Sequence, residues 1–186
     1  MKPHFDIEKI VDAGIISNEL DYERALIADR KLRLLASENL HFKNLRLRLR
    51  DLIEKYENSE WNDVNKIDEH KLLESEKYER IAESERLFFE HRKQSIRKKL
   101  KEFGLTQENL GSILGHKSKT HMSELMNGIK PFTLKDLIII HQLLKIEIPL
   151  LIPVFLSQED QAKVKEAVIK LDKPKVKLKN DDLVLC

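Results

Sequence analysis

The chain has 186 residues, of which 35% are charged and 41% hydrophobic, and it contains only 5 Gly and 5 Pro. A composition so rich in charge and so poor in turn residues favours long helices over a sheet protein. The formal net charge is +2, and the single Cys, Cys186, is the last residue, which excludes a disulfide framework or a cysteine metal site within one chain and suits a reducing cytoplasm.

The first long helix is expected to begin at Ser17 and to run to about Ala36. The segment "SNEL" places Glu19 and Asp21 in the first turn, where acidic side chains interact favourably with the helix dipole. The apolar positions of this helix are expected to be Leu20, Leu26, Ile27, Leu34 and Leu35.

The next segment, "HFKNLRLRLRDLIEKYE", allows two interpretations. The strict alternation of "LRLRLR" is typical of a strand, but over a longer window Leu45, Leu49, Leu52, Ile53 and Tyr56 recur at helical spacing. The longer pattern predicts a helix. The Asn- and Asp-rich segment "NSEWNDVN" (58–65) is expected to break it.

Residues 67–103 contain no Gly or Pro and are dense in Glu, Lys and Arg. A thin apolar seam of Ile81, Phe88, Ile96 and Leu100 predicts one long connecting helix, or two helices that meet near Ser84. We expect Gly104 to end it as a C-terminal cap.

After Gly104 the pattern changes to two short helices. Thr106 is the expected N-cap of the first, and the second runs from about Lys119 to Met126 after a tight turn at Gly115. The expected core positions are Leu110, Ile113, Leu114, Met122, Leu125 and Met126. Two such helices form a helix-turn-helix unit, in which the small Gly111 lets the helices approach closely.

Further short helical elements follow this unit. Thr133 is expected to cap "TLKDLIIIHQLLK", and a last turn, "EIPLLIPVF", would complete the core. After Ser157 the spacing of Val164, Val168 and Leu171 predicts an amphipathic helix, and the tail from Pro174 is expected to be mobile or extended.

The charges are segregated along the sequence. Residues 51–90 contain 6 Lys/Arg and 13 Asp/Glu, a net charge of −7, whereas residues 91–130 contain 9 Lys/Arg and 3 Asp/Glu, a net charge of +6. An acidic block beside a basic block indicates either two surfaces with different partners or two solvated helix faces.

No segment predicts contact with a membrane. The N-terminus carries acidic residues early and lacks the apolar segment of a signal peptide. The most apolar stretch, residues 134–156, is interrupted by four charged residues and two prolines, which indicates buried core rather than a bilayer span. We therefore expect a cytoplasmic protein.

The sequence matches known enzyme motifs and metal-binding motifs poorly. "GSILGHKS" differs from a phosphate-binding loop because three residues separate Gly111 from Gly115 and His116 precedes Lys117. His116 and His121 lack a third ligand at metal-site spacing, and no paired-carboxylate, nucleophile-elbow or dinucleotide pattern occurs. We expect no catalytic residues, no metal and no cofactor.

The basic, hydroxyl-rich start of the second short helix instead indicates DNA binding, since such side chains reach phosphates and base edges in the major groove. Because the apolar side chains face the core, Lys119, Thr120 and Ser123 should face the groove, while Gln107 and Lys117 should hold phosphates. The full predicted set is Gln107, Lys117, Ser118, Lys119, Thr120, His121, Ser123 and Asn127. The alternative is a small helical bundle with a basic surface.

The sequence also resembles a known family. The run "LTQENLGSILG…MSELMNGIKPFTLKDLIIIHQLLKI" is similar to the five-helix DNA-binding domain of the lambda-repressor-like (Xre) family. HigA-type antitoxins are resembled more closely by three short motifs, "KS…SELMNG", "FTLKDL" and "IPLLI". The segment "ISNELDYERALIADRKLRLLA" resembles the N-terminal helical region of these antitoxins. The resemblance covers residues 17–57 and 94–156. The turn after Gly115, the acidic connector and the tail are longer than the family pattern.

This resemblance implies an all-α fold with a C-terminal five-helix, lambda-repressor-like helix-turn-helix domain. The expected parts are an N-terminal helical region (1–66), a charged connecting helix (67–93), the helix-turn-helix domain (94–156), and an amphipathic helix with a mobile tail (157–186).

The resemblance further implies a homodimeric repressor that binds operator DNA and is not itself an enzyme. As a HigA-type antitoxin, it would neutralise a HigB-like mRNA endonuclease while repressing its own operon. A toxin that grips RNA must be basic, so we expect it to dock on residues 17–90, which include the acidic block. The alternative is a stand-alone Xre-type regulator without a toxin partner.

Overall fold

A computed structural model describes residues 6–37, 39–63, 67–153, 158–171 and 173 of the chain. All regular elements in these ranges are helices, which confirms the predicted all-α class. The chain divides into two compact units, residues 1–146 and 147–186. Within the described ranges, no helix is both long enough and apolar enough to cross a membrane.

The N-terminal part of the first unit contains α1 (Ile7–Ala13), α2 (Glu19–Leu35) and α3 (Leu40–Glu60). Each begins at an Asp or Asn whose side chain accepts a hydrogen bond from a backbone N–H of the first turn. The cap of α2 is Asn18, one residue after the predicted Ser17. We call α1 to α3 the N-terminal helices.

The buried face of α2 differs from the predicted one. Ala25, Ala28 and Leu32 face the core, whereas Leu34, predicted to be apolar core, is 71% exposed. Leu34 follows Leu32 by two residues, and two helical residues turn the side chain by about 200°. Leu26 and Leu35, also predicted, are partly buried and pack against the core, so the prediction was wrong for Leu34 and missed the two alanines.

The helical interpretation of "LRLRLR" is confirmed, since this segment lies inside α3. Leu45, Leu49, Leu52 and Ile53 are buried, and Tyr56 is partly buried. The arginines of the alternating segment point away from this apolar stripe, and Arg46 pairs with Asp29 of α2 at 2.9 Å.

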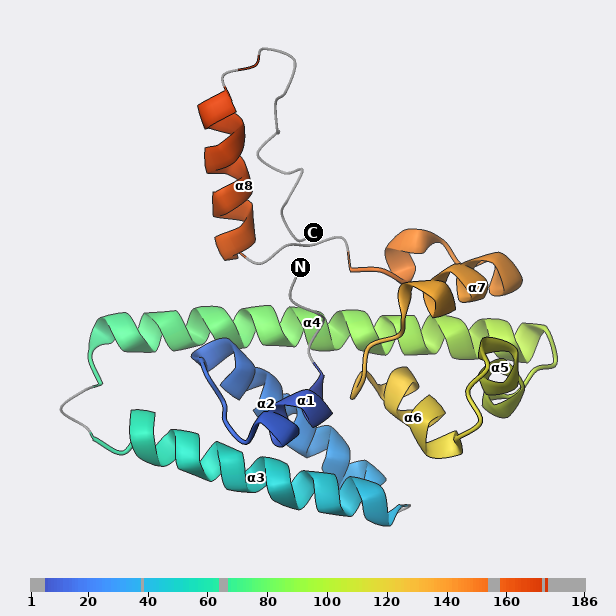
Figure 1. Cartoon of the computed structure of the whole chain (residues 1–186), viewed down its shortest axis with the longest axis horizontal. Coiled ribbons are helices and arrows are strands. Elements are labelled where there is room, and N and C mark those ends of the chain that lie inside the picture. The colour runs from blue at the N-terminus through green and yellow to red at the C-terminus, as the bar shows by residue number, and fades with distance from the viewer. Residues whose placement is uncertain (1–5, 38, 64–66, 154–157, 172, 174–186) are drawn as a thin grey trace. The chain divides into compact units, whose positions relative to one another are not determined.

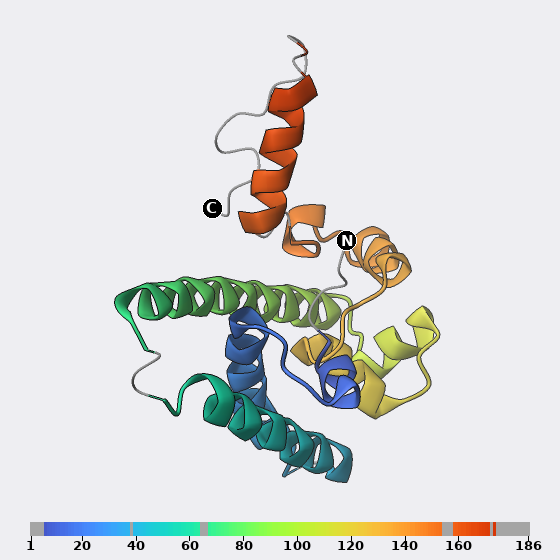
Figure 2. The same cartoon turned by 60° about the vertical axis from the view of Figure 1, so that its left-hand side comes forward.

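The connecting segment forms one continuous helix, α4 (Glu69–Glu102), so the two-helix alternative near Ser84 is wrong. Its 34 residues span about 51 Å at the α-helical rise. The N-terminal helices pack beneath its first half, and the later helices of this unit surround its second half (Figures 1 and 2). Two residues of the predicted apolar seam, Ile96 and Leu100, are buried, whereas Ile81 and Phe88 are partly exposed. The buried face of α4 also includes Ala82 and Arg92.

The second half of α4 contacts α5 (Gln107–Leu114), α6 (Lys119–Asn127) and α7 (Leu134–Leu144). The predicted caps Thr106 and Thr133 are confirmed, and each forms a reciprocal capping box. Gly104 also adopts a left-handed conformation after α4, with φ 65°.

The second unit contains the 3₁₀ turn η2 (Ile148–Leu150) and α8 (Gln158–Leu171). The helix predicted after Ser157 is thereby confirmed, whereas the mobile tail predicted from Pro174 lies outside the described residues. The predicted domain boundaries remain predictions, and α4 runs without interruption across the one placed between residues 93 and 94.

Candidate nucleic-acid interface

The two helices of the predicted helix-turn-helix unit pack through buried apolar side chains. Leu110 and Leu114 of α5 are buried, as are all three predicted core residues of α6 (Met122, Leu125 and Met126). Ile113 was expected to face inward but is 45% exposed. Leu110 and Leu114 stand four residues apart and define the buried stripe of α5, so the intervening Ile113 lies at its edge.

Gly111 lies where α5 meets α6, as the sequence predicts. A Cβ added there would lie 3.5 Å from Met122 Cγ and 3.4 Å from the backbone oxygen of His116. These are contact distances without overlap. The helices are therefore in close approach at this position, but an alanine would also fit.

The turn between the two helices is anchored from both sides. Gly115 adopts a left-handed conformation with φ 85°, which suits glycine, and the N–H of His116 donates to the Gly111 carbonyl at 2.8 Å. On the other side, His116 Nε2 lies 3.2 Å from a carboxylate oxygen of Asp136, a buried residue of the α7 capping box, but does not form a hydrogen bond with it. The turn therefore holds the start of α6 in a defined place.

The start of α6 presents a basic, exposed surface. Lys117, Ser118 and Lys119 are all exposed, and we call these three residues the basic end of α6. Ser118 Oγ accepts from the His121 N–H at 3.2 Å and caps the helix. Lys119 pairs with Glu108 of α5 at 2.7 Å, but both side chains are more than half exposed, so water screens the pair.

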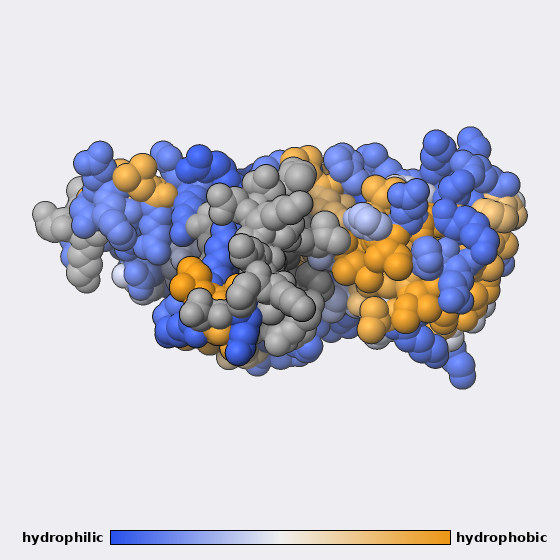
Figure 3. Space-filling model, turned by 90° about the horizontal axis from the view of Figure 1, so that it is seen from above, coloured by the Kyte–Doolittle hydropathy of each residue, from blue (hydrophilic) through white to orange (hydrophobic). Residues whose placement is uncertain are grey.

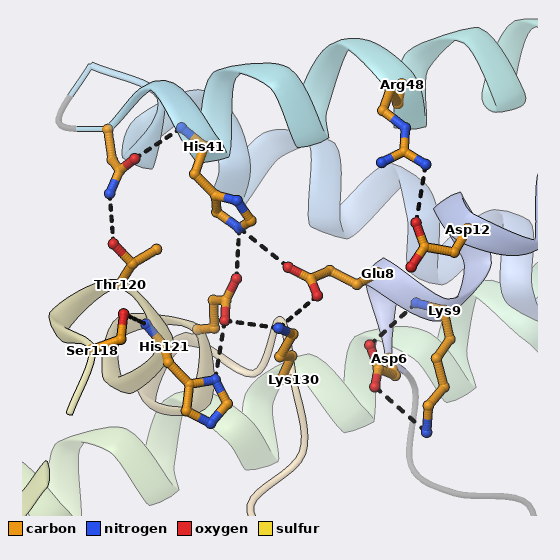
Figure 4. A network of polar contacts seen from close by, with 12 residues as sticks. Asp6, Glu8, Lys9, Asp12, His41, Arg48, Ser118, Thr120, His121 and Lys130 are labelled. Atoms are coloured by element: carbon orange, nitrogen blue, oxygen red, sulfur yellow. Dashed lines mark hydrogen bonds and ion pairs between the residues drawn. The ribbon is translucent and has the colours of Figure 1, made fainter. Parts of the chain in front are cut away.

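Another side of α6 faces the N-terminal helices and α4 rather than solvent. Thr120 Oγ1 accepts a hydrogen bond from Asn39 Nδ2 at 2.8 Å (Figure 4). Asn127 is only 8% exposed; its Nδ2 donates to the Ser123 carbonyl at 2.8 Å and its Oδ1 accepts from Lys93 at 2.9 Å. The side chain of Asn127 is thus used inside the protein, whereas the Ser123 side chain is partly exposed.

The centre of this buried side is Glu124, which the sequence did not single out. Its carboxylate is 3% exposed and lies 2.6 Å from His41 Nε2, 3.1 Å from Lys130 Nζ and 3.2 Å from His121 Nδ1. Glu8 of α1 joins them, at 3.2 Å from His41 and 2.5 Å from Lys130 (Figure 4). We call these five residues the Glu124 cluster.

Opposing effects act on the pKa values in this cluster. Burial alone raises the pKa of Glu124, but its contacts with Lys130 and His41 outweigh burial and bring the pKa below its usual range. Burial likewise lowers the pKa of Lys130, yet its hydrogen bonds to the two carboxylates raise the pKa above its ordinary value. Both side chains are thus held in their charged forms.

The remaining predicted residue, Gln107, is the first residue of α5 and is partly exposed. The pair between Lys119 and the neighbouring Glu108 brings the starts of α5 and α6 together. The structure therefore gathers Gln107 and the basic end of α6 at one place.

No protein-family model matches the sequence, and comparisons with curated proteins and with solved structures gave no match.

Proposed function

We propose that the chain is a sequence-specific DNA-binding repressor that uses α5 and α6 as a helix-turn-helix. The observation that carries this proposal is the geometry of the pair: two capped short helices bury Met122 and Leu125 and leave Lys117 and Lys119 exposed at the start of α6. In such a unit, the start of the second helix enters the major groove.

The proposed DNA contacts fall into two classes, those to phosphates and those to base edges. Lys117 and Gln107 are proposed to hold phosphates, and Lys119 and Ser123 to reach base edges. Thr120 already accepts one hydrogen bond from Asn39, but a hydroxyl has a donor and two acceptor sites, so it can still contact a base. We leave Asn127 out of this set because its side chain is buried and fully hydrogen-bonded.

The test is a selection of bound sequences from random duplex DNA, followed by affinity measurements with fluorescence anisotropy. Lys117→Ala should weaken binding to all sequences and lower the slope of log affinity against log salt by about one. Ser123→Ala should change sequence preference, with a loss of about 1–3 kcal/mol on the selected site.

The matched control is Lys55→Ala, which removes an exposed lysine from α3, outside the proposed interface. It should leave both affinity and salt slope unchanged. Selection of no sequence, or equal effects of the Lys117 and Lys55 replacements, would contradict the proposal.

One helix-turn-helix contacts few base pairs, so we propose that two copies bind an inverted repeat whose half-site centres lie roughly 34 Å apart. Exposed apolar side chains support self-association. Leu134 and Ile138 of α7 are 65% and 47% exposed, and Figure 3 shows apolar residues gathered on the face that carries α7. The apolar sequence "IEIPLLIPVFL" (146–156) is a second candidate for this contact, and in it Ile148 and Leu150 are each 47% exposed.

We further propose that the protein is the antitoxin of a small basic endonuclease, as the HigA resemblance implies. What supports this is the exposure of the acidic block on the N-terminal helices and the first half of α4. Its exposed carboxylates are those of Asp51, Glu54, Glu60, Asp63, Asp68, Glu69, Glu74, Glu76 and Glu79. A neighbouring reading frame for a small basic protein would favour the antitoxin over a stand-alone regulator.

A further inference from the structure

Three potential metal ligands from distant parts of the sequence meet in the Glu124 cluster. Glu8 lies on α1, His41 on α3 and Glu124 on α6, and one ligand atom from each lies within 4.8 Å of the other two. His41 Nε2 is placed between the two carboxylates, 3.2 Å from Glu8 and 2.6 Å from Glu124 (Figure 4).

The donor set has the chemistry of a zinc site. Zinc binds imidazole nitrogen and carboxylate oxygen, whereas magnesium and calcium prefer oxygen ligands alone. Bonds near 2.0 Å place the ligand atoms of a tetrahedral zinc about 3.3 Å apart. The His41–Glu8 distance of 3.2 Å already matches this edge, and His41 and Glu124 need to separate by only a fraction of an ångström.

The charges in the cluster also favour a cation. A histidine ligand of zinc must be a neutral imidazole, and with His41 and His121 neutral the two carboxylates share only the Lys130 ammonium. One negative charge is then in excess beside a Glu124 side chain that is 3% exposed. Lys130 is 24% exposed and has a long flexible stem, so its ammonium can move to solvent. A divalent ion would then neutralise both carboxylates.

His121, which is not one of the three proposed ligands, holds the carboxylate of Glu124 in position. His121 Nδ1 lies 3.2 Å from Glu124 Oε2, while Glu124 Oε1 faces His41. A group that holds the second oxygen of a ligating carboxylate fixes the direction of the first, and such outer contacts affect metal affinity strongly.

We propose that Glu8, His41 and Glu124 form a zinc-binding site, in which the ion binds His41 Nε2 and the carboxylate oxygens that face it, water completes the coordination, and the Lys130 ammonium moves to solvent. Because the three ligands come from α1, α3 and α6, zinc would join the N-terminal helices to α6. This site is independent of whether α6 binds DNA.

The test is isothermal titration of the metal-free full chain, without an affinity tag, with zinc chloride. All proteins carry Cys186→Ser, which removes a thiol that would itself bind zinc. We expect one zinc ion per chain and an increase in the melting temperature, because binding energy stabilises the folded state. Magnesium chloride should give neither effect.

Two variants remove ligands, and one provides the matched control. Glu8→Gln and His41→Gln should each weaken zinc binding by roughly 10–100-fold. Both replacements keep a polar group, and the melting temperature of each variant in EDTA separates a loss of zinc affinity from a loss of stability. His91→Gln makes the same change at an exposed position on α4 and should leave zinc affinity unchanged.

A third variant tests whether the Lys130 ammonium competes with zinc for the two carboxylates. Lys130→Met removes the competing ammonium and should tighten zinc binding on the order of tenfold. The proposal is overturned if the parent protein takes up no zinc, if uptake is undiminished in His41→Gln and Glu8→Gln, or if Lys130→Met binds zinc no more tightly than the parent.

Discussion

Lys31 is a partly buried cation at the contact of α2 with the end of α6. Its ammonium donates to the Asn127 carbonyl at 2.8 Å, and it lines a small cavity of about 30 Å³ together with Ala28, Phe89 and Ile129. Burial lowers the pKa of Lys31 to about 8, from an ordinary value of 10.5.

This lowered pKa predicts a rise in stability with pH. The folded chain releases the Lys31 proton near pH 8, whereas the unfolded chain keeps it until near pH 10.5. Between these values the unfolded state binds more protons, so this residue makes the free energy of unfolding increase with pH. Lys31→Met removes the effect, and the stability of the parent relative to this variant should increase by about 2 kcal/mol from pH 7 to pH 10.

Urea unfolding at the two pH values measures this difference. Lys55→Met, at an exposed position, is the control, because its difference from the parent should be the same at both pH values. A pH-independent difference for Lys31→Met would contradict the assignment of the lowered pKa.

Arg92 of α4 is a second cation inside the protein, and aromatic rings surround it. It is only 5% exposed, and its guanidinium lies 4.9 Å from the Phe89 ring centre, 5.1 Å from Phe132 and 5.7 Å from Phe88. Burial lowers its pKa to about 10, so it remains charged at neutral pH. Aromatic faces attract the planar guanidinium and partly replace its lost water. The contact with Phe132 fixes the segment before α7 against α4.

At the scale of elements, the continuity of α4 decides how the other helices of the first unit are arranged. Near its middle, Glu85 accepts two hydrogen bonds from the Arg24 guanidinium of α2, at 2.7 and 2.5 Å. The neighbouring Ser84 donates to the Arg80 carbonyl four residues earlier, a common alternative for a hydroxyl inside a helix. The sequence allowed a break here, and the structure has none.

Continuity of α4 predicts strong sensitivity to proline at this point. Ser84→Pro should lower the free energy of unfolding by about 3 kcal/mol or more, because proline removes a helical hydrogen bond and collides with the preceding turn. Ser84→Ala should change it by less than about 0.5 kcal/mol. Urea unfolding followed by circular dichroism measures both. A proline cost below about 1 kcal/mol would indicate two separate helices in solution.

At the scale of the whole molecule, the acidic block ends and the basic block begins within one helix, α4. The acidic half of α4 packs on α2, and the basic half packs on α5, α6 and α7. Glu8, Asn39 and His41 also contact residues on or just after α6. A fragment that ended at residue 90 would cut α4 and this contact, so the two proposed binding functions must be separated within the full chain.

Charge reversals on α4 provide that separation. Glu69→Lys with Glu76→Lys should abolish rescue of cells that express the neighbouring basic toxin and leave DNA affinity unchanged, because like charges repel. Lys98→Glu with Lys101→Glu, the matched reversal on the basic half, should weaken DNA binding and keep rescue. All four positions are exposed. Growth assays, with the proposed basic toxin partner as the expressed protein, and anisotropy measure the two effects. The opposite pattern would refute the proposed division.

The sequence by itself determined most of the helices. The spacing of Leu45, Leu49 and Leu52 outweighed a strand-like alternation, and Thr106 and Thr133 capped their helices as predicted. These features depend on residues within one or two helical turns, so local hydrogen bonds and apolar spacing suffice to specify them.

Tertiary structure alone decided which faces are buried and which polar groups meet. Leu34 and Ile113 fit an apolar pattern yet lie exposed, because burial depends on the partner helix as well as on spacing. The Glu124 cluster joins residues 8, 41, 124 and 130, and no sequence spacing links them. They meet because α1, α3 and α6 pack in one unit, and a buried carboxylate there requires cationic and imidazole partners.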